Sequence, residues 1–410
     1  MTVPLPLITP IIHPPTGPSS ARPSLGATIT SLSLSSLFDP AARSFDEARE
    51  HPAFKAVEEA LYKHKVVVIK GQEELGEWPE RQFEFVRAFD PAAGADHGHN
   101  DATASHRGQK SLLYGIGNSI TGHPEVKLVG GGKQGERFGG KELQQADHTT
   151  YHKFPLSHEE REAGLTRWHR WHMDASLFRT SLPLVTSLLC LGTPSLDPLT
   201  NTLRPPLTVQ WTGVGGEPLE MRVLAGATGF VEGERMWELL PEGDGVGERG
   251  WCEGCVVEYA PWPYQWSSPS RGNSNGLGTY DDPSSPSNNN TPLEDLPPYD
   301  KERDVKRYPM VWTCPRTGRK GVQVHPVAVL ALHPPAPSPP ITDLSLIRAI
   351  LNRIQQPALV PENIWAPGYE EGDVVVFDNR AVYHSATDYP ESWGTRTMLQ
   401  AHVAASFDPR

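Results

Sequence analysis

The sequence predicts a mainly β protein with flanking helices, whose core is a double-stranded β-helix of the jelly-roll, cupin-like type. From Arg167 onward the chain contains many short alternating or β-branched runs separated by turn residues, which is typical of packed antiparallel sheets. The irregular spacing of these runs favours a two-sheet jelly roll over a parallel α/β fold. We find no internal repeat in the sequence.

The first part of the chain combines strands with amphipathic helices. Strands are expected at 26–34 and 64–70, and helices at 44–63 and 80–89. Residues 90–150 read as a long irregular region with one clear strand at 126–129. Further strands are expected at 184–191, 207–211, 220–224, 256–259, 309–313, 322–324, 374–377 and 397–405, with helices at 232–240 and 343–355.

We expect one domain over residues 25–410, because 410 residues can bury a single large core. Residues 1–24 are rich in Pro and are predicted to form a loosely packed N-terminal arm. A stretch at about 267–300 is dominated by Ser, Pro, Asn, Gly and Asp, and is predicted to be a surface insertion.

Composition argues against several classes of function. The formal net charge is −12 and no Lys/Arg run suggests a nucleic-acid groove or a membrane-surface patch. No apolar run approaches the length of a spanning helix, and the N-terminus lacks the basic start of a signal peptide. Four cysteines do not suggest a disulfide framework, so we expect a reducing compartment, most simply the cytoplasm. Cys252 and Cys255 have the spacing of half a zinc site or a redox pair, but no second such pair exists.

The pair His172 and Asp174 is the first candidate for chemistry. In an extended strand the two side chains project from the same side, so an imidazole and a carboxylate can share one divalent metal ion. One further His would complete the two-His, one-carboxylate arrangement of non-haem Fe(II), which leaves open positions for O2 and a co-substrate. The pair alone is weak evidence, because similar pairs occur at His99–Asp101 and His158–Glu160.

The second half of the predicted site lies near the C-terminus. A predicted strand leads through the corner Asp378-Asn379-Arg380 to His384, which is the expected third ligand. Arg396 follows twelve residues later, and its planar guanidinium suits a carboxylate such as the far end of 2-oxoglutarate. Taken singly, His384 could be a core histidine and Arg396 a salt-bridge partner, but the joint pattern is much rarer than its parts.

These motifs resemble the taurine-dioxygenase-like superfamily of Fe(II)/2-oxoglutarate-dependent dioxygenases, and their order along the chain is the same. The resemblance implies that His172, Asp174 and His384 bind iron and that Arg396 binds 2-oxoglutarate. It also implies that Thr228, ahead of the helix at 232–240, binds the co-substrate.

A closer resemblance is to the fungal xanthine dioxygenases, and it covers about residues 25–405. It rests on Arg170–Ala175, Glu258–Trp266, Arg271–Gly278, Tyr308–Trp312, His384–Pro390 and Arg396–Met398. The family pattern has a substrate-facing Gln at Gln400 and an Asn at the position of His402. Because residues alternate along a strand, Arg396, Gln400 and His402 are expected on one face. Lys127, Gln134 and Gln145 are weaker candidates, expected more often to be ordinary surface residues.

The resemblance implies hydroxylation of xanthine at C8 to urate, coupled to conversion of 2-oxoglutarate and O2 into succinate and CO2. One alternative is a related dioxygenase acting on a sulfonate, an aryloxy acid or another purine. An alternative of another class is a jelly-roll binding protein without catalytic activity. A zinc or redox protein built on Cys252 and Cys255 is a third.

Overall fold

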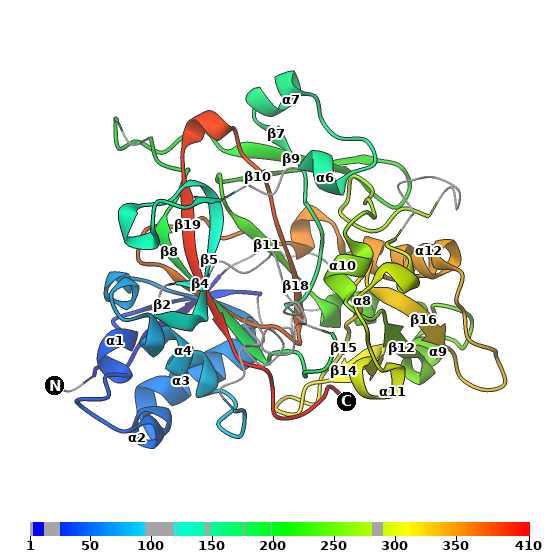
Figure 1. Ribbon diagram of the computed structural model, residues 1–410, viewed down its shortest axis with the longest axis horizontal. Coiled ribbons are helices and arrows are strands. Elements are labelled where there is room, and N and C mark those ends of the chain that lie inside the picture. The colour runs from blue at the N-terminus through cyan, green and yellow to red at the C-terminus, as the bar shows by residue number, and fades with distance from the viewer. Residues whose placement is uncertain are drawn as a thin grey trace.

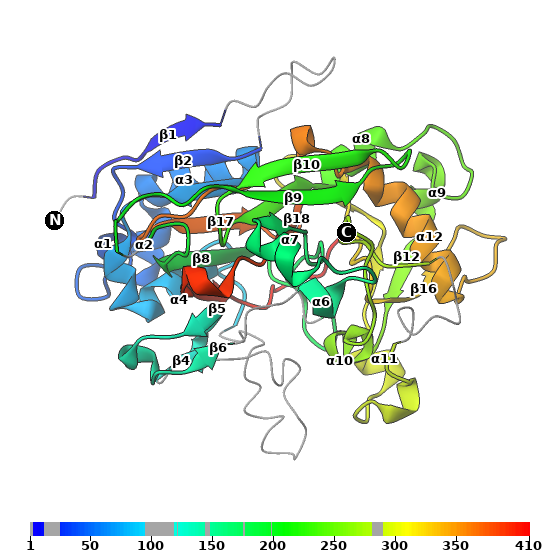
Figure 2. The same cartoon turned by 90° about the horizontal axis from the view of Figure 1, so that it is seen from above.

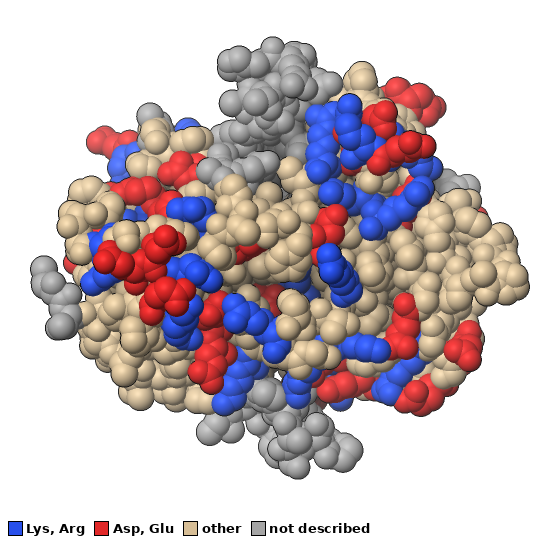
Figure 3. Space-filling model, turned by 90° about the horizontal axis from the view of Figure 1, so that it is seen from below, with Lys and Arg blue, Asp and Glu red and all other residues tan. Residues whose placement is uncertain are grey.

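The computed structural model describes residues 3–11, 25–94, 119–120, 122–143, 148–174, 177–197, 199–280 and 290–410. One large sheet organises this part of the chain, with the helices of the first hundred residues at one end of the molecule and several smaller sheets, together with the later helices, at the other (Figures 1 and 2). None of the described helices has the length and apolar character needed to cross a membrane. On the face seen in Figure 3, cationic and anionic side chains are interspersed.

The large sheet runs in the order β1-β2-β3-β17-β8-β19-β5-β4, and β6 also pairs with β5. Its pairs are antiparallel except for β2 and β3, which are parallel and are connected through the first helices. The strands are β1 (Leu7–Pro10), β2 (Ala27–Thr30), β3 (Val66–Ile69), β17 (Val374–Asp378), β8 (Val185–Gly192), β19 (Arg396–His402), β5 (His123–Lys133), β4 (Ser119–Ile120) and β6 (Glu142–Leu143).

Amphipathic helices cover one face of this sheet. In α3 (Pro52–His64) the helical spacing buries Phe54, Val57 and Leu61 against the strands. Helix α4 (Pro79–Arg87) packs on β5, β8 and β19, and the buried Gln82 amide donates to Ser187 Oγ at 3.0 Å and to Leu399 O at 2.9 Å. The short helices α1 (Leu34–Leu37) and α2 (Phe45–Glu50) complete this layer.

The other face of the sheet packs against the second layer of strands. The two-stranded sheet of β11 (Thr228–Glu232) and β18 (Val382–Ala386) contributes Phe230 and Val382 to a core shared with Val375 and Met398 of the large sheet. Further strands are β7 (Leu165–Thr166), β9 (Leu207–Thr212), β10 (Pro218–Val223), β12 (Val256–Tyr259), β13 (Arg307–Pro309), β14 (Val311–Thr313), β15 (Lys320–Val322) and β16 (Val329–His333).

Helices also cover the strands of the second half. The longest is α12 (Leu344–Gln355), which begins at the N-cap Asp343 and buries Ile347, Ile350 and Leu351. The others are α6 (His148–Tyr151), α7 (His158–Glu162), α8 (Gly233–Leu239), α9 (Arg249–Gly254), α10 (Pro263–Ser267) and α11 (Lys301–Asp304).

The predicted fold class is confirmed, and three local predictions need correction. The expected helix at 44–63 is two helices, because the chain turns at His51 before Pro52, which starts α3. Leu34 belongs to α1 rather than to the preceding strand. Residues 7–10, in the arm expected to be loose, form an edge strand paired with β2.

The predicted surface insertion at 267–300 is also partly wrong. Ser270, Asn275, Leu277 and Thr279 are buried, because this segment packs under the residues that precede His172. The Trp171 indole N–H donates to Asn275 O at 2.9 Å. The small and polar composition that suggested a surface loop therefore fills the interior at this point.

Candidate metal centre and co-substrate site

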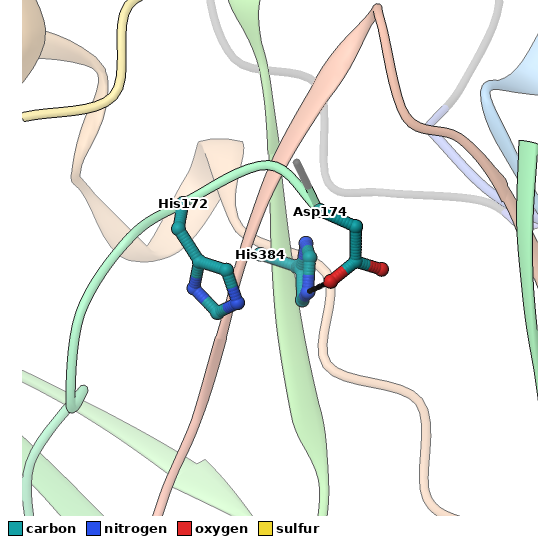
Figure 4. Close-up of side chains that lie close together, drawn as sticks. All are labelled: His172, Asp174 and His384. Atoms are coloured by element: carbon teal, nitrogen blue, oxygen red, sulfur yellow. Dashed lines mark ion pairs between the residues drawn. The ribbon is translucent and has the colours of Figure 1, made fainter. Parts of the chain in front are cut away.

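Two separate segments bring His172, Asp174 and His384 together between the two layers of strands. The backbones of His172 and His384 pair as an isolated antiparallel bridge, with N–O distances of 3.0 and 2.8 Å. His384 comes from β18, whereas His172 and Asp174 come from an irregular extended segment (Figure 4). One nitrogen or oxygen atom from each side chain lies within 4.8 Å of the others, and this is the one such cluster among the described residues.

The chemistry of these three side chains fits a divalent metal ion. His172 Nδ1 lies 2.9 Å from Arg170 O; a carbonyl can only accept, so Nδ1 carries a proton and Nε2 is the nitrogen that can bind a metal. Burial, followed by the neighbouring His172, lowers the pKa of His384 to about 3, which keeps its imidazole neutral. Burial alone raises the pKa of Asp174, but the neighbouring histidines outweigh it and the net shift is downward. Two imidazoles therefore face one carboxylate.

Asn379 fixes the position of Asp174. Its buried side chain accepts from Asp174 N at 2.7 Å and donates to Asp174 O at 2.6 Å and to Pro183 O at 3.0 Å. The corner at 378–380 thus holds one segment of the cluster as well as leading to His384. Sequence reasoning identified this corner as a pattern but gave Asn379 no role.

Gln400 also contacts Asp174. The Gln400 Nε2 donates to Asp174 Oδ2 at 3.1 Å, while the other carboxylate oxygen of Asp174, Oδ1, lies 3.7 Å from His384 Nε2. Gln400 was expected to face substrate; in the structure its amide nitrogen orients the carboxylate. This contact leaves Oδ1 on the side of the two imidazoles.

Arg396 and Thr228 form a second polar group on the same inner face. Arg396 begins β19, and its Nε donates to Gly226 O at 2.9 Å while one Nη lies 3.5 Å from Thr228 Oγ1. Thr228 is buried at the start of β11, two residues before Phe230, which pairs with His384. The arginine also lies over the ring of Tyr369, whose pKa burial raises to about 12. An anion bound here would meet a fixed cation and a hydroxyl.

Lys127 lies opposite Gln400 across the β5–β19 pair, so both side chains occupy the inner face. The expectation of a surface residue was wrong: Lys127 is 4% exposed, and burial lowers its pKa to about 8 against the opposing effect of Asp174. His402 is also buried on this face, and its proximity contributes to the lowered pKa of Asp174.

The remaining candidates from the sequence are Gln134, Gln145 and the alternative pairs His99–Asp101 and His158–Glu160. Gln134 is buried rather than on the surface; it donates to Arg396 O at 3.2 Å and accepts from Thr397 Oγ1 at 2.7 Å, so it fixes the start of β19. Gln145 and the pair His99–Asp101 lie outside the described residues, whereas His158 is exposed on α7.

A buried histidine beside the site was not predicted from the sequence, and the pair Cys252 and Cys255 was predicted only as an alternative site. His325, which was not predicted, is buried with its ring centroid 6.3 Å from that of His172; the Val-His-Pro sequence around it gave no signal. Cys252 and Cys255 are buried free thiols whose pKa values burial raises to about 12, which describes unreactive thiols rather than a redox pair.

Comparison with known proteins agrees with this geometry. Residues 33–402 match the family model described as "Taurine catabolism dioxygenase TauD, TfdA family". The chain is 35% identical over 404 residues to an alpha-ketoglutarate-dependent xanthine dioxygenase of Emericella nidulans, with 98% of each chain covered. It is 32% identical to a protein of the same description from Neurospora crassa, covering 99% of this chain and 88% of that one. A crystal structure described as a putative alpha-ketoglutarate-dependent taurine dioxygenase from Burkholderia xenovorans shares the fold, with a TM-score of 0.50 at 14% identity over 98% of this chain and 94% of that chain.

Proposed function

Since the chain belongs to the taurine catabolism dioxygenase TauD, TfdA family, we propose that it hydroxylates xanthine at C8 to form urate. As an alpha-ketoglutarate-dependent dioxygenase, the enzyme uses 2-oxoglutarate and O2 as co-substrates together with a metal. We propose that this metal is Fe(II). We also propose that the protein acts in the cytoplasm. The observation that carries the proposal is the cluster of two imidazoles and one carboxylate, with a fixed arginine on the same inner face.

In this proposal His172, Asp174 and His384 hold the metal through His172 Nε2, His384 Nε2 and Asp174 Oδ1. Asn379 and Gln400 keep the carboxylate oriented, as outer partners of metal ligands commonly do. When bound, Fe(II) supplies the activation of O2 that is coupled to decarboxylation of 2-oxoglutarate.

The protein supplies the binding and the orientation of the two organic substrates. Arg396 receives the far carboxylate of 2-oxoglutarate through its remaining N–H groups, and Thr228 Oγ1 gives a second hydrogen bond. Buried side chains around the cluster exclude water from the reacting atoms.

Xanthine is proposed to lie against Lys127, Gln400 and His402, the polar side chains that share the inner face of β5 and β19. Lys127 can donate to a purine carbonyl oxygen, and the Gln400 carboxamide oxygen can accept from a ring N–H. His402, where the family pattern has Asn, still offers one donor or acceptor to the heterocycle. The assignment of xanthine rests on the relatives of that description, which the chain covers almost completely.

The proposed activity is tested by assembling the reaction without air and starting it by adding O2. Protein, Fe(II), ascorbate, 2-oxoglutarate and xanthine are mixed without air; O2 is then admitted and urate absorbance and succinate are measured. We expect urate and succinate in equal amounts. If neither urate nor succinate forms, the proposed activity as a whole is contradicted. If succinate forms with another heterocycle but not with xanthine, only the proposed substrate is contradicted.

A further inference from the structure

A cavity separate from the metal cluster is lined in part by Asp378 and Arg380 of the corner at 378–380. Its volume is about 520 Å³, and none of the three proposed metal ligands lines it. Consecutive residues of the corner contact the metal cluster and the cavity: the Asn379 side chain hydrogen-bonds to the backbone of Asp174, and Asp378 lines the cavity. A cavity of this size is in the range that holds small organic ligands.

Most of the cavity wall is aromatic or aliphatic. The main apolar contributors come from α3, from the chain after α4, from β14 and from the C-terminal segment: Tyr62, Phe89, Leu184, Trp312 and Phe407. Such a wall suits a flat, mainly apolar ligand.

Hydrogen bonds fix the C-terminal part of this wall. Ser406 donates from N and from Oγ to Asp90, both at 2.7 Å, and Thr313 N donates to Arg410 O at 2.6 Å. An Arg380 Nη donates to Phe407 O at 2.6 Å. The wall is therefore tied at three places to the body of the protein.

The charged groups at the cavity are mostly engaged by other protein atoms. Arg316 pairs with Glu58 at 2.7 Å, and Arg380 also donates to Leu182 O at 2.8 Å. Asp408 accepts from the Tyr308 hydroxyl at 3.0 Å, and Arg410 lies exposed at the surface.

Asp378 is the exception. It is 4% exposed, and one carboxylate oxygen accepts from Arg380 N at 3.1 Å. Its other oxygen has no hydrogen-bond partner within the described ranges. The neighbouring Lys65 directs its Nζ to Tyr62 O at 2.9 Å rather than to this carboxylate, but its positive charge still acts on Asp378. Burial raises the pKa of Asp378, and the charges of Lys65 and Arg380, with the Arg380 N–H, offset that rise only in part.

Asp378 is thus a mostly buried carboxylate at the cavity wall with a single hydrogen bond from the described part of the protein, and a ligand with N–H donors would add the hydrogen bonds it lacks. We propose that this cavity is a second small-molecule site, which binds a planar aromatic amidine or amino-heterocycle through its N–H donors and the carboxylate of Asp378. The aromatic body of the ligand packs between the walls formed by Tyr62, Trp312 and Phe407.

Cys314 gives a reporter inside the cavity. It lines the wall and is half-buried, whereas the other three cysteines are fully buried. We would measure by mass spectrometry the rate at which N-ethylmaleimide alkylates Cys314 in the full-length protein, with benzamidine as the probe. Benzamidine is expected to slow alkylation at least fivefold at saturation, and benzoate, which has the same shape and the opposite charge, is expected not to.

Variants separate binding at Asp378 from binding elsewhere. Asp378→Asn should lose the protection, and Asp295→Asn, an exposed matched control, should keep it. If Asp378→Asn does not fold, Phe407→Ala should still weaken benzamidine binding at least threefold, because it removes one aromatic wall without touching Asn379.

Any of these results would overturn the proposal: no protection of the wild-type protein, full protection of a folded Asp378→Asn variant, equal protection by benzoate, or loss of protection when xanthine and 2-oxoglutarate are added. The last result would place the probe in the metal centre instead. A Phe407→Ala variant with unchanged affinity would also count against the cavity.

Discussion

The two faces of β19 show how one strand serves stability on one side and chemistry on the other. Leu399 and Ala401 point into the apolar core under α3 and α4. Arg396, Gln400 and His402 alternate with them and point toward the metal cluster, with Met398 as the apolar member of that face. A fixed period of two therefore places functional groups on a rigid support whose other side is held by hydrophobic packing.

The largest expected effect concerns the inner face and its metal. His172→Ala removes one of three proposed ligands, and we expect turnover to fall by about a thousandfold or more, because catalysis needs the complete metal site. Succinate formation and Fe(II) affinity would be measured together. His158→Ala, in a similar but exposed motif, is the matched control and should retain full activity. Full turnover by the His172 variant would exclude the ligand assignment.

The outer face should respond in the opposite way. Leu399→Ala opens a cavity under α4, and we expect the free energy of unfolding to fall by about 2–5 kcal/mol. The kcat of the molecules that remain folded should change little. Urea unfolding, with activity normalised to the folded fraction, tests this separation. A selective loss of kcat without a loss of stability would show that the two faces are not independent.

The same comparison explains which features the sequence could predict. Alternation along a strand is a local property, so the order of residues is enough to place Arg396, Gln400 and His402 on one side of β19. Likewise, the apolar spacing of α12 and its Asp343 cap predicted that helix. These features depend only on neighbours along the chain.

The residues that were mispredicted are ones whose surroundings depend on distant segments. Lys127 was predicted to be a surface lysine. Its burial follows from pairing with Gln400, which lies 273 positions further along the chain (400 − 127), so nearby residues could not reveal it. Asn275 read as part of a surface loop, yet it is covered by the segment before His172. Polar composition reports the usual environment of a residue, whereas tertiary pairing decides the actual one.

The third prediction concerns the carboxylate-binding end of the inner face. Arg396→Met removes the fixed cation, and we expect KM for 2-oxoglutarate to rise by about tenfold to a hundredfold, with a smaller change in kcat. Arg222→Met, at an exposed position on β10, serves as the control. An unchanged KM for 2-oxoglutarate would move the co-substrate away from Arg396.

Gln400 sharpens the division of roles within the inner face. Gln400→Leu keeps the volume and removes the donor to Asp174 Oδ2. If the amide orients the carboxylate, metal affinity should fall by about tenfold, a loss typical of a group next to a metal ligand. Titration with Fe(II) and the KM for xanthine distinguish the two functions. An unchanged metal affinity with a raised KM for xanthine would assign Gln400 to substrate binding alone.

The smallest expected effect is on the free energy of unfolding, and it shows whether the buried Lys127 of the inner face destabilises the protein. Burial lowers the pKa of Lys127 to about 8 from its ordinary value near 10.5, so above pH 8 the unfolded chain binds more protons than the folded protein. The free energy of unfolding of the metal-free protein should therefore rise with pH between those two values because of this residue. Lys127→Met should lack this contribution, and between pH 8 and 9 the two proteins should converge by about 1 kcal/mol. Parallel stability curves across this range would show that Lys127 titrates normally, and the inner face would then hold its lysine without an energetic penalty.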